Sequence, residues 1–174
     1  MRFLDLAEQR FSVLQFDPRP IEQDKLDAIV RAGQLAPTAC NFQPQRILAL
    51  TSAARIAQLQ DVMRCKLPFA AAMLVCYDKT ACWYRPCDGT SSGEIDASIV
   101  TTHMMLEATE LGLGSIWVMS WNPEKMRDAF AIPESFEPVS LLILGYKAES
   151  AAPRSGHLSR KPLQETVFWD HFSE

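Results

Sequence analysis

The stretch from Glu94 to Leu111 constrains the fold most, because it is a long helix candidate with apolar residues on two sides. A helix at the surface of a core needs only one apolar stripe. Two stripes require two covering surfaces, so we expect a sheet on one side and a second surface, such as that of a homodimer partner, on the other. The stripes are Ile95, Ile99 and Leu106, and Val100, Met104, Ala108 and Leu111.

Short apolar runs of strand length alternate with segments of helical spacing along the rest of the chain. We therefore predict an α+β layered domain of four short strands and four or five helices. The strands are expected at 46–51, 72–77, 115–119 and 138–144. The further helices are expected before Arg10 and at 22–35, 52–65 and 123–130.

Three segments read as irregular. Phe11–Phe16 is expected to form an extended arm after the first helix, and Asp78–Gly93 a long surface loop that contains aromatic residues. The segment 147–162 is rich in Ala, Ser and Pro. The sequence thus predicts one domain over 1–174, with an extended C-terminal tail over 147–174.

Composition excludes several classes of function. The 174 residues carry a net charge of -4 without a block of Lys or Arg, which argues against nucleic acid as the partner. The longest apolar run, Phe69–Tyr77, is far below the roughly 20 residues that span a bilayer, and the N-terminus lacks the apolar stretch of a signal peptide. We expect a cytoplasmic protein. Five cysteines without a close pair indicate reduced thiols and no metal site.

Basic residues gather at both ends of the chain. Arg10 and Ser12 lie two apart in the expected arm, so their side chains point to the same side and suit phosphate oxygens, although the pair taken alone is better explained by an ordinary helix-end arginine. The tail is basic between Glu149 and Glu165, and it is either an anion site or a solvated segment. Its cluster comprises Arg154, His157, Arg160 and Lys161.

The loop from Thr38 to Gln43 follows a helix that Pro37 stops. Asn41 and Gln43 each offer donors and acceptors, which matches a ligand edge that alternates donor and acceptor, such as the pyrimidine side of a flavin. The alternative is that these amides only form the turn. Lys66, before a buried strand, could extend to solvent or face a ligand.

Two other reactive residue types are assigned lesser roles. His103 lies within the long helix and reads as a core or interface histidine rather than a catalytic one. Cys82 and Cys87 flank the aromatic residues of the surface loop without a general base nearby in sequence. A catalytic thiol therefore remains a minor alternative.

Five motifs, in one order, resemble the nitroreductase family of flavoenzymes and span nearly the whole chain. Any one alone would carry little weight, but their order and spacing argue against chance. They are RFSVLQF (10–16), APTACNFQP (36–44), LGLGSIW (111–117), ILGY (143–146) and RKPL (160–163).

The resemblance implies a layered α+β fold, with a mostly antiparallel sheet flanked by helices, in a homodimer that exchanges its C-terminal tails. It also implies FMN at the subunit interface and no catalytic side chain, because the flavin carries the chemistry. The implied cofactor-binding residues are Arg10, Phe11, Ser12, Leu14, Thr38, Ala39, Asn41, Gln43, Lys66, Trp117, Arg160 and Lys161.

The family pattern also divides these residues by role. Arg10 and Ser12 resemble contacts to the FMN phosphate and ribityl chain, and Arg160 and Lys161 resemble C-terminal phosphate contacts. The loop from Thr38 to Gln43 resembles one that reaches a flavin bound mainly by the partner subunit. Lys66 falls near a family lysine that approaches flavin N1 and O2.

The implied activity is hydride transfer from NAD(P)H through flavin N5 to a small acceptor, such as a nitroaromatic or a quinone. The alternative is a flavin-binding or sensing protein with little turnover. It is motivated by Leu14, which stands where the family usually has Lys or Arg, and by Met119, where it often has Gly. Gln45 also replaces the common Trp after the Gln-Pro pair.

Overall fold

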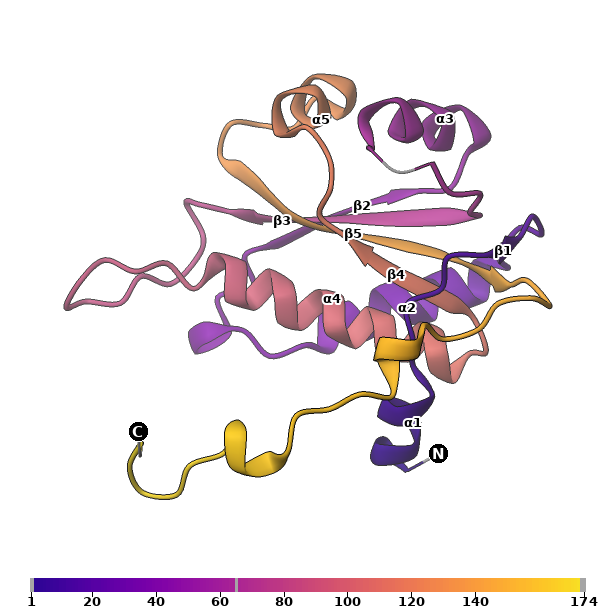
Figure 1. Cartoon of the computed structure of the whole chain (residues 1–174). Coiled ribbons are helices and arrows are strands. Elements are labelled where there is room, and N and C mark those ends of the chain that lie inside the picture. Colours follow the sequence, from indigo (N-terminus) through magenta and orange to yellow (C-terminus); the bar gives the residue numbers. More distant parts are fainter. Residues whose placement is uncertain (1, 65, 173–174) are drawn as a thin grey trace.

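A sheet covered by helices on both faces forms the body of the protein (Figure 1). The computed structural model describes residues 2–64 and 66–172. Within them the helices are α1 (Phe3–Gln9), α2 (Gln23–Leu35), α3 (Ala53–Val62), α4 (Gly93–Glu110) and α5 (Pro123–Phe130). The strands are β1 (Phe16–Asp17), β2 (Gln45–Leu50), β3 (Ala71–Asp78), β4 (Gly114–Val118) and β5 (Phe136–Lys147).

The strand β5 organises the sheet, since it pairs with β1, β3 and β4. Every pairing in the described sheet is antiparallel, and β2 lies at the edge beyond β3. The predicted α+β class and antiparallel sheet are confirmed. The prediction of four strands missed the two-residue β1, and β5 extends further at both ends than the predicted 138–144.

Two apolar clusters fill the space on either side of the sheet. Successive side chains of a strand point to opposite faces, so Met73 and Val75 pack toward α2 and α4, whereas Ala72 and Leu74 pack toward the face that α3 and α5 cover. Burial on both faces explains why β3 reads as a continuous apolar run rather than an alternating one.

The helix α4 is confirmed in almost its predicted bounds, and its two stripes differ in burial. Val100, Met104 and Ala108 are fully buried, and Gly33 of α2 lets the two helices approach closely, because a Cβ there would lie 2.8 Å from the Met104 side chain. By contrast, Ile95 is 62% exposed and Ile99 only half-buried. The chain therefore covers one stripe of α4 and leaves the start of the other in contact with solvent.

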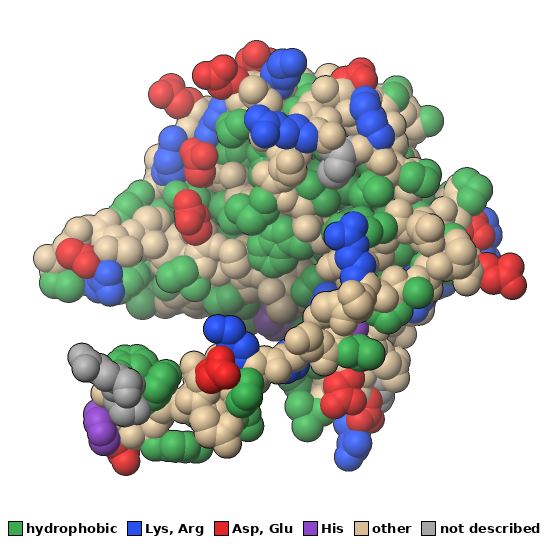
Figure 2. All heavy atoms as spheres, viewed as in Figure 1, with side chains coloured by type: hydrophobic (Ala, Val, Ile, Leu, Met, Phe, Trp, Pro, Cys, Tyr) green, Lys and Arg blue, Asp and Glu red, His purple; other side chains and the backbone are tan. Residues whose placement is uncertain are grey.

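The tail after β5 leaves the body and runs beneath α4 as an irregular segment with two short 3-10 turns, Ser155–His157 and Leu163–Glu165 (Figure 1). Figure 2 shows open space between its far part and the body, with hydrophobic side chains gathered at its end. In the part of the chain that the structure describes, no helix has the length and apolarity needed to cross a membrane.

Candidate functional site

The arm that follows α1 lies along β4. The Val13 N–H donates to the Ser115 carbonyl oxygen at 2.9 Å, and the Val13 side chain is 2% exposed. This anchor fixes the residues on either side of Val13 against the strand. The predicted arm is thus present, although only Phe16 and Asp17 pair as a regular strand.

A cavity of about 540 Å³ opens between this arm, β4 and the start of the tail. We call it the arm–tail cavity. Its size lies within the roughly 300–1,000 Å³ usual for small-molecule and cofactor sites. It is lined by Arg10, Phe11, Ser12, Leu14, Ile116, Trp117, Arg154, Ser155, Gly156 and His157.

The donors around the arm–tail cavity suit an anion. Arg10 and Arg154 bring guanidinium groups, Ser12 brings a hydroxyl, and the ring of His157 packs edge-on against Phe11 at 6.1 Å between centroids. The Lys147 ammonium lies 5.9 Å from the centre of the Phe11 ring and adds a cation nearby. Arginine and hydroxyl donors of this kind bind phosphate oxygens well.

The strand β4 carries two buried polar atoms that have no hydrogen-bond partner among the described residues, Trp117 Nε1 and Ser115 Oγ, and of these two residues Trp117 lines the cavity. Buried donors are nearly always satisfied in folded proteins, so the unpaired indole N–H of this cavity-lining residue leaves a donor to which a bound ligand could supply an acceptor. Acceptor-rich groups, including the phosphate, ribityl hydroxyls and ring carbonyls of FMN, fit this donor set.

The predicted loop from Thr38 to Gln43, which we call the amide loop, has an unusual backbone. Cys40, Asn41 and Gln43 have φ angles of 48°, 56° and 51°, in the left-handed region that non-glycine residues seldom adopt. The Gln43 N–H donates to Thr38 Oγ1 at 3.0 Å, which closes the loop on itself. Asn41 and Gln43 are exposed; the Gln43 side-chain amide donates to the Asn41 carbonyl at 3.3 Å, and the other side-chain amide groups are available to a ligand.

A second cavity, of about 350 Å³, lies between the amide loop, the loop after β3 and α4. Thr38 and Ala39 form part of its wall, and Trp83 and Asp96 contribute from the other two segments. Its full lining is Pro37, Thr38, Ala39, Trp83, Arg85, Thr90, Ser91, Ser92, Ile95, Asp96 and Ile99.

The structure brings together only part of the predicted set. Of the twelve residues, five line the arm–tail cavity, namely Arg10, Phe11, Ser12, Leu14 and Trp117. Thr38, Ala39, Asn41 and Gln43 lie together on the amide loop. The remaining three, Lys66, Arg160 and Lys161, line neither of these two cavities.

These three cations are held by neighbours near them in sequence. Lys66 follows α3. Its ammonium donates to the Gln60 carbonyl at 3.0 Å and lies 3.6 Å from an Asp61 carboxylate oxygen, and both partners belong to the last turn of that helix. Arg160 donates to the carbonyls of His157 and Ser159. Lys161 is 3.9 Å from Glu165. Within this one chain, then, Lys66 is directed toward the end of α3.

Sequence reasoning omitted three residues from the site. Arg154 and His157 were recognised only as members of a basic cluster, yet they line the arm–tail cavity. Asp96 was not singled out at all, although its carboxylate bonds the amide loop. An acidic residue in the first turn of a helix was the available signal, and the helix dipole accounts for such a residue equally well.

The cysteines give little support to a thiol mechanism. The described ones, Cys40, Cys76, Cys82 and Cys87, are all free. Cys82 is buried, with its sulfur 3.2 Å from Ser91 Oγ, whereas Cys87 is exposed. Burial raises the pKa of the Cys76 thiol to about 11, so it stays protonated near neutral pH. No group of metal-ligating side chains occurs among the described residues.

Similar proteins share both the sequence pattern and the fold. The sequence model described as "Nitroreductase family" matches residues 7–81 and 63–146. A crystal structure of a nitroreductase family protein from Clostridium difficile 630 is 38% identical, with a TM-score of 0.92, and the match covers 99% of this chain and 100% of that one.

Two further relatives are more distant. An FMN reductase [NAD(P)H] of Bacillus subtilis strain 168 is 23% identical over 82% of this chain and 65% of its own length. A structure from Exiguobacterium sibiricum 255-15, in complex with FMN, is 20% identical over 98% of both chains, with a TM-score of 0.86. With the family pattern matched over most of its length and the fold shared throughout, the chain belongs to the nitroreductase family.

Proposed function

We propose that this protein is an FMN-dependent oxidoreductase that takes reducing equivalents from NAD(P)H and passes them to a small acceptor, such as a nitroaromatic or a quinone. The observation that carries the proposal is the arm–tail cavity, where Arg10, Ser12 and Arg154 surround a space of about 540 Å³ beside the unpartnered Trp117 indole N–H. Family membership and the FMN-bound relative agree with this reading.

When bound, FMN supplies hydride acceptance and donation at its N5 atom. In this proposal the chain contributes binding and orientation. Arg10, Ser12 and Arg154 hold the phosphate end, and Trp117 donates to an acceptor atom of the cofactor. The amide loop presents Asn41 and Gln43 to the alternating donors and acceptors of the flavin edge.

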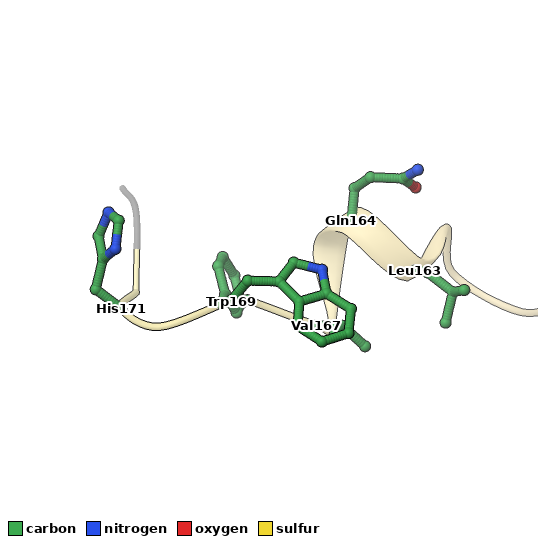
Figure 3. A pocket seen from close by; sticks show the side chains of 6 residues that line it. Leu163, Gln164, Val167, Trp169 and His171 are labelled. Carbon is green, nitrogen blue, oxygen red and sulfur yellow. The ribbon is translucent and has the colours of Figure 1, made fainter.

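The tail is the basis for proposing a homodimer. Figure 3 shows Leu163, Val167 and Trp169 around a hollow that is formed by tail residues only. Trp169 is 82% exposed and Phe172 is 88% exposed, although the Phe172 ring meets that of Phe168 edge-on, so most of their apolar surface is left uncovered by their own chain. Such apolar surface usually marks an interface, and the exposed Ile95 stripe of α4 adds to it.

A tail exchanged between two copies covers both surfaces. It also carries Arg160 and Lys161 away from the body of their own chain, which explains how they can serve a site that they do not reach within one chain. The amide loop of one subunit then faces a flavin that is held mainly by the other. A two-fold dimer of this kind contains two equivalent sites.

The direct test is an absorbance spectrum of the purified protein, before and after each nicotinamide is added without oxygen. We expect visible flavin absorbance that NADH or NADPH bleaches and that a quinone restores. A colourless protein that gains no flavin absorbance with added FMN would overturn the proposal. Light scattering on the same sample measures the mass, and we expect that of two chains.

A second candidate is a flavin-binding or sensing protein with little turnover, and it rests on Leu14. This residue lines the arm–tail cavity at a position where the resemblance leads us to expect a cation. A cation near the flavin stabilises its reduced, anionic form, so Leu14 lowers the tendency of bound FMN to accept electrons. Prompt bleaching by NADH or NADPH and reoxidation by a quinone would exclude this candidate.

A further inference from the structure

Asp96 is a buried acid that joins two segments far apart in the sequence. Its side chain is 2% exposed and lies in the first turn of α4. One carboxylate oxygen accepts the Ala39 backbone N–H at 2.9 Å, and the other accepts the Ser92 hydroxyl at 2.8 Å. Thus one carboxylate ties the amide loop to the start of the longest helix.

The amide loop needs such a tie because its conformation is costly. Residues that carry a Cβ are strained in the left-handed region, asparagine less than most, and Cys40, Asn41 and Gln43 all lie there. Packing contributes little, since these three side chains are exposed. The strain must be offset by the loop's hydrogen bonds.

Most of those bonds are local. The Asn41 and Phe42 N–H groups donate to the Thr38 and Ala39 carbonyls at 3.0 Å each, the Gln43 side-chain amide donates to the Asn41 carbonyl at 3.3 Å, and Arg46 donates to the Gln43 carbonyl at 3.4 Å. The Thr38 hydroxyl closes the loop internally, by accepting the Gln43 N–H. At the far end, the Asp78 N–H donates to the Pro44 carbonyl at 2.9 Å and fixes the exit to β2. Between the end of α2 and this exit, Asp96 provides a bond from the loop backbone to a buried side chain of the body.

A carboxylate suits this position for electrostatic reasons. A negative charge in the first turn of an 18-residue helix is stabilised by the helix dipole, and Asp96 occupies that turn. Hydrogen bonds to a charged acceptor are about twice as strong as neutral ones. The bond to Ala39 can therefore offset a substantial part of the backbone strain.

We propose that Asp96 is a positioning residue, which holds the amide loop in its left-handed conformation and so presents Asn41 and Gln43 to the ligand. The part that concerns the ligand rests on the proposed flavin function. The part that concerns the loop stands on the geometry alone, and the two parts are measured separately.

The experiment compares Asp96→Ala, Asp96→Asn and the control Thr101→Val in the full-length protein. Asparagine keeps an oxygen to accept the Ala39 N–H, and its amide can donate to Ser92. Thr101 is fully buried on the same helix, where it bonds Ser140 Oγ at 2.6 Å and the Ala97 carbonyl. Its replacement removes buried hydrogen bonds but leaves the loop untouched.

The first readout is hydrogen exchange at the Ala39 amide without flavin. We expect Asp96→Ala to accelerate exchange about tenfold or more, because hydrogen bonds to charged groups carry that much stabilisation, while Asp96→Asn stays within about threefold. In Thr101→Val, the ratio of the exchange rate at the Ala39 amide to the rates at amides of α4 should equal that of the wild type. Equal exchange at Ala39 in Asp96→Ala and Thr101→Val would overturn the proposal.

The second readout is FMN affinity, together with the visible spectrum of bound flavin. We expect Asp96→Ala to raise the Kd about tenfold and to shift the spectrum toward that of free FMN, with both restored by Asp96→Asn. Wild-type affinity and spectrum in Asp96→Ala would overturn the ligand part. If the wild-type protein binds no FMN, the proposed function fails, and the exchange readout still decides the role of Asp96.

Discussion

The amide loop and the tail both carry residues that the sequence assigns to one flavin site, yet they are held in different ways. The amide loop is strained but bonded to the body through Asp96. The tail makes mostly local bonds, such as those from Arg160 to the carbonyls of His157 and Ser159. One region is preorganised by its own chain, whereas the far part of the other, in the dimer that we propose, is covered by a second copy.

This difference bears on how a binding site is completed. A preorganised loop loses little conformational freedom when a ligand arrives, but an extended tail loses much. The cost of ordering the tail is best met by burying its apolar side chains against a second copy, before any flavin binds. We therefore expect assembly to precede tight cofactor binding.

The largest expected effect comes from removing the tail. A chain that ends at Ala151 loses Arg154 and His157 from the arm–tail cavity, along with Trp169 and its apolar neighbours. We expect it to be monomeric and to bind FMN at least about 100-fold more weakly, since two or more charge-assisted hydrogen bonds are lost. Light scattering and flavin titration measure both. If the truncated protein is still a dimer and still binds flavin, the tail is needed for neither, and the proposed contrast between the amide loop and the tail is wrong.

Single arginine variants compare a residue of the arm–tail cavity with a residue of the tail. Arg10→Ala and Arg160→Ala are each expected to weaken FMN binding by about 1.5–3 kcal/mol, the usual scale for hydrogen bonds to charged groups. Arg10 lines the cavity within one chain, but Arg160 requires the tail to be docked. The control is Arg55→Ala, an exposed arginine on α3 that bonds Gln58. Unchanged affinity in both test variants would mean that the phosphate lies elsewhere.

Two glycines provide a matched pair for stability. A Cβ at Gly93, at the start of α4, would lie 2.1 Å from the Tyr77 ring, whereas a Cβ at Gly156, in the tail, would meet nothing within 4 Å. We expect Gly93→Ala to lower the free energy of unfolding by about 1–3 kcal/mol through overpacking. Gly156→Ala should change it by less than about 0.5 kcal/mol. Urea unfolding compares them, and equal losses would show that the tail is packed as tightly as the body.

The smallest effect concerns thiol chemistry. Cys40, on the amide loop, and Cys87 are exposed, and we expect both to react with iodoacetamide at pH 7. The raised pKa of Cys76, about 11, keeps its buried thiol protonated below that pH, so its labelling should rise only as the pH approaches this value or the protein unfolds. Peptide mass spectrometry separates the sites. Rapid labelling of Cys76 at pH 7 would indicate that the sheet and helices around it unfold locally, and that the body is less tightly packed than its contrast with the exposed tail suggests.

The sequence predicted the fold closely where periodicity reports burial. The prediction of α5 was correct at both ends, since Pro123 marks its start and the apolar spacing marks its length. The two-residue β1 was missed, because Phe16 and Asp17 carry no repeat and pair only where the end of β5 passes them. The periodicity of a sequence describes one segment at a time, whereas the pairing of β1 with β5 depends on two segments that are far apart in the sequence.

The same limit applies to the candidate site. Arg10 and Ser12 were placed together because they share one short arm. Lys66 could not be placed, since a position before a strand does not determine which way a flexible side chain turns, and the structure turns it to Gln60. Asp96 was missed because its partner, the Ala39 N–H, lies 57 residues away and belongs to the backbone, which no residue pattern reveals.

The exposed Trp169 is a natural fluorescent probe of the proposed dimer. The chain has four tryptophans, and Trp83, Trp117 and Trp121 are already half-buried in the body, so their emission should change less than that of Trp169 when two copies meet. Trp169 is 82% exposed in one chain, and in the proposed dimer it would pass from water into an interface. Dilution of the flavin-free protein should shift its fluorescence to the red at the concentration where the dimer dissociates, and a Trp169→Phe variant should lose most of that shift.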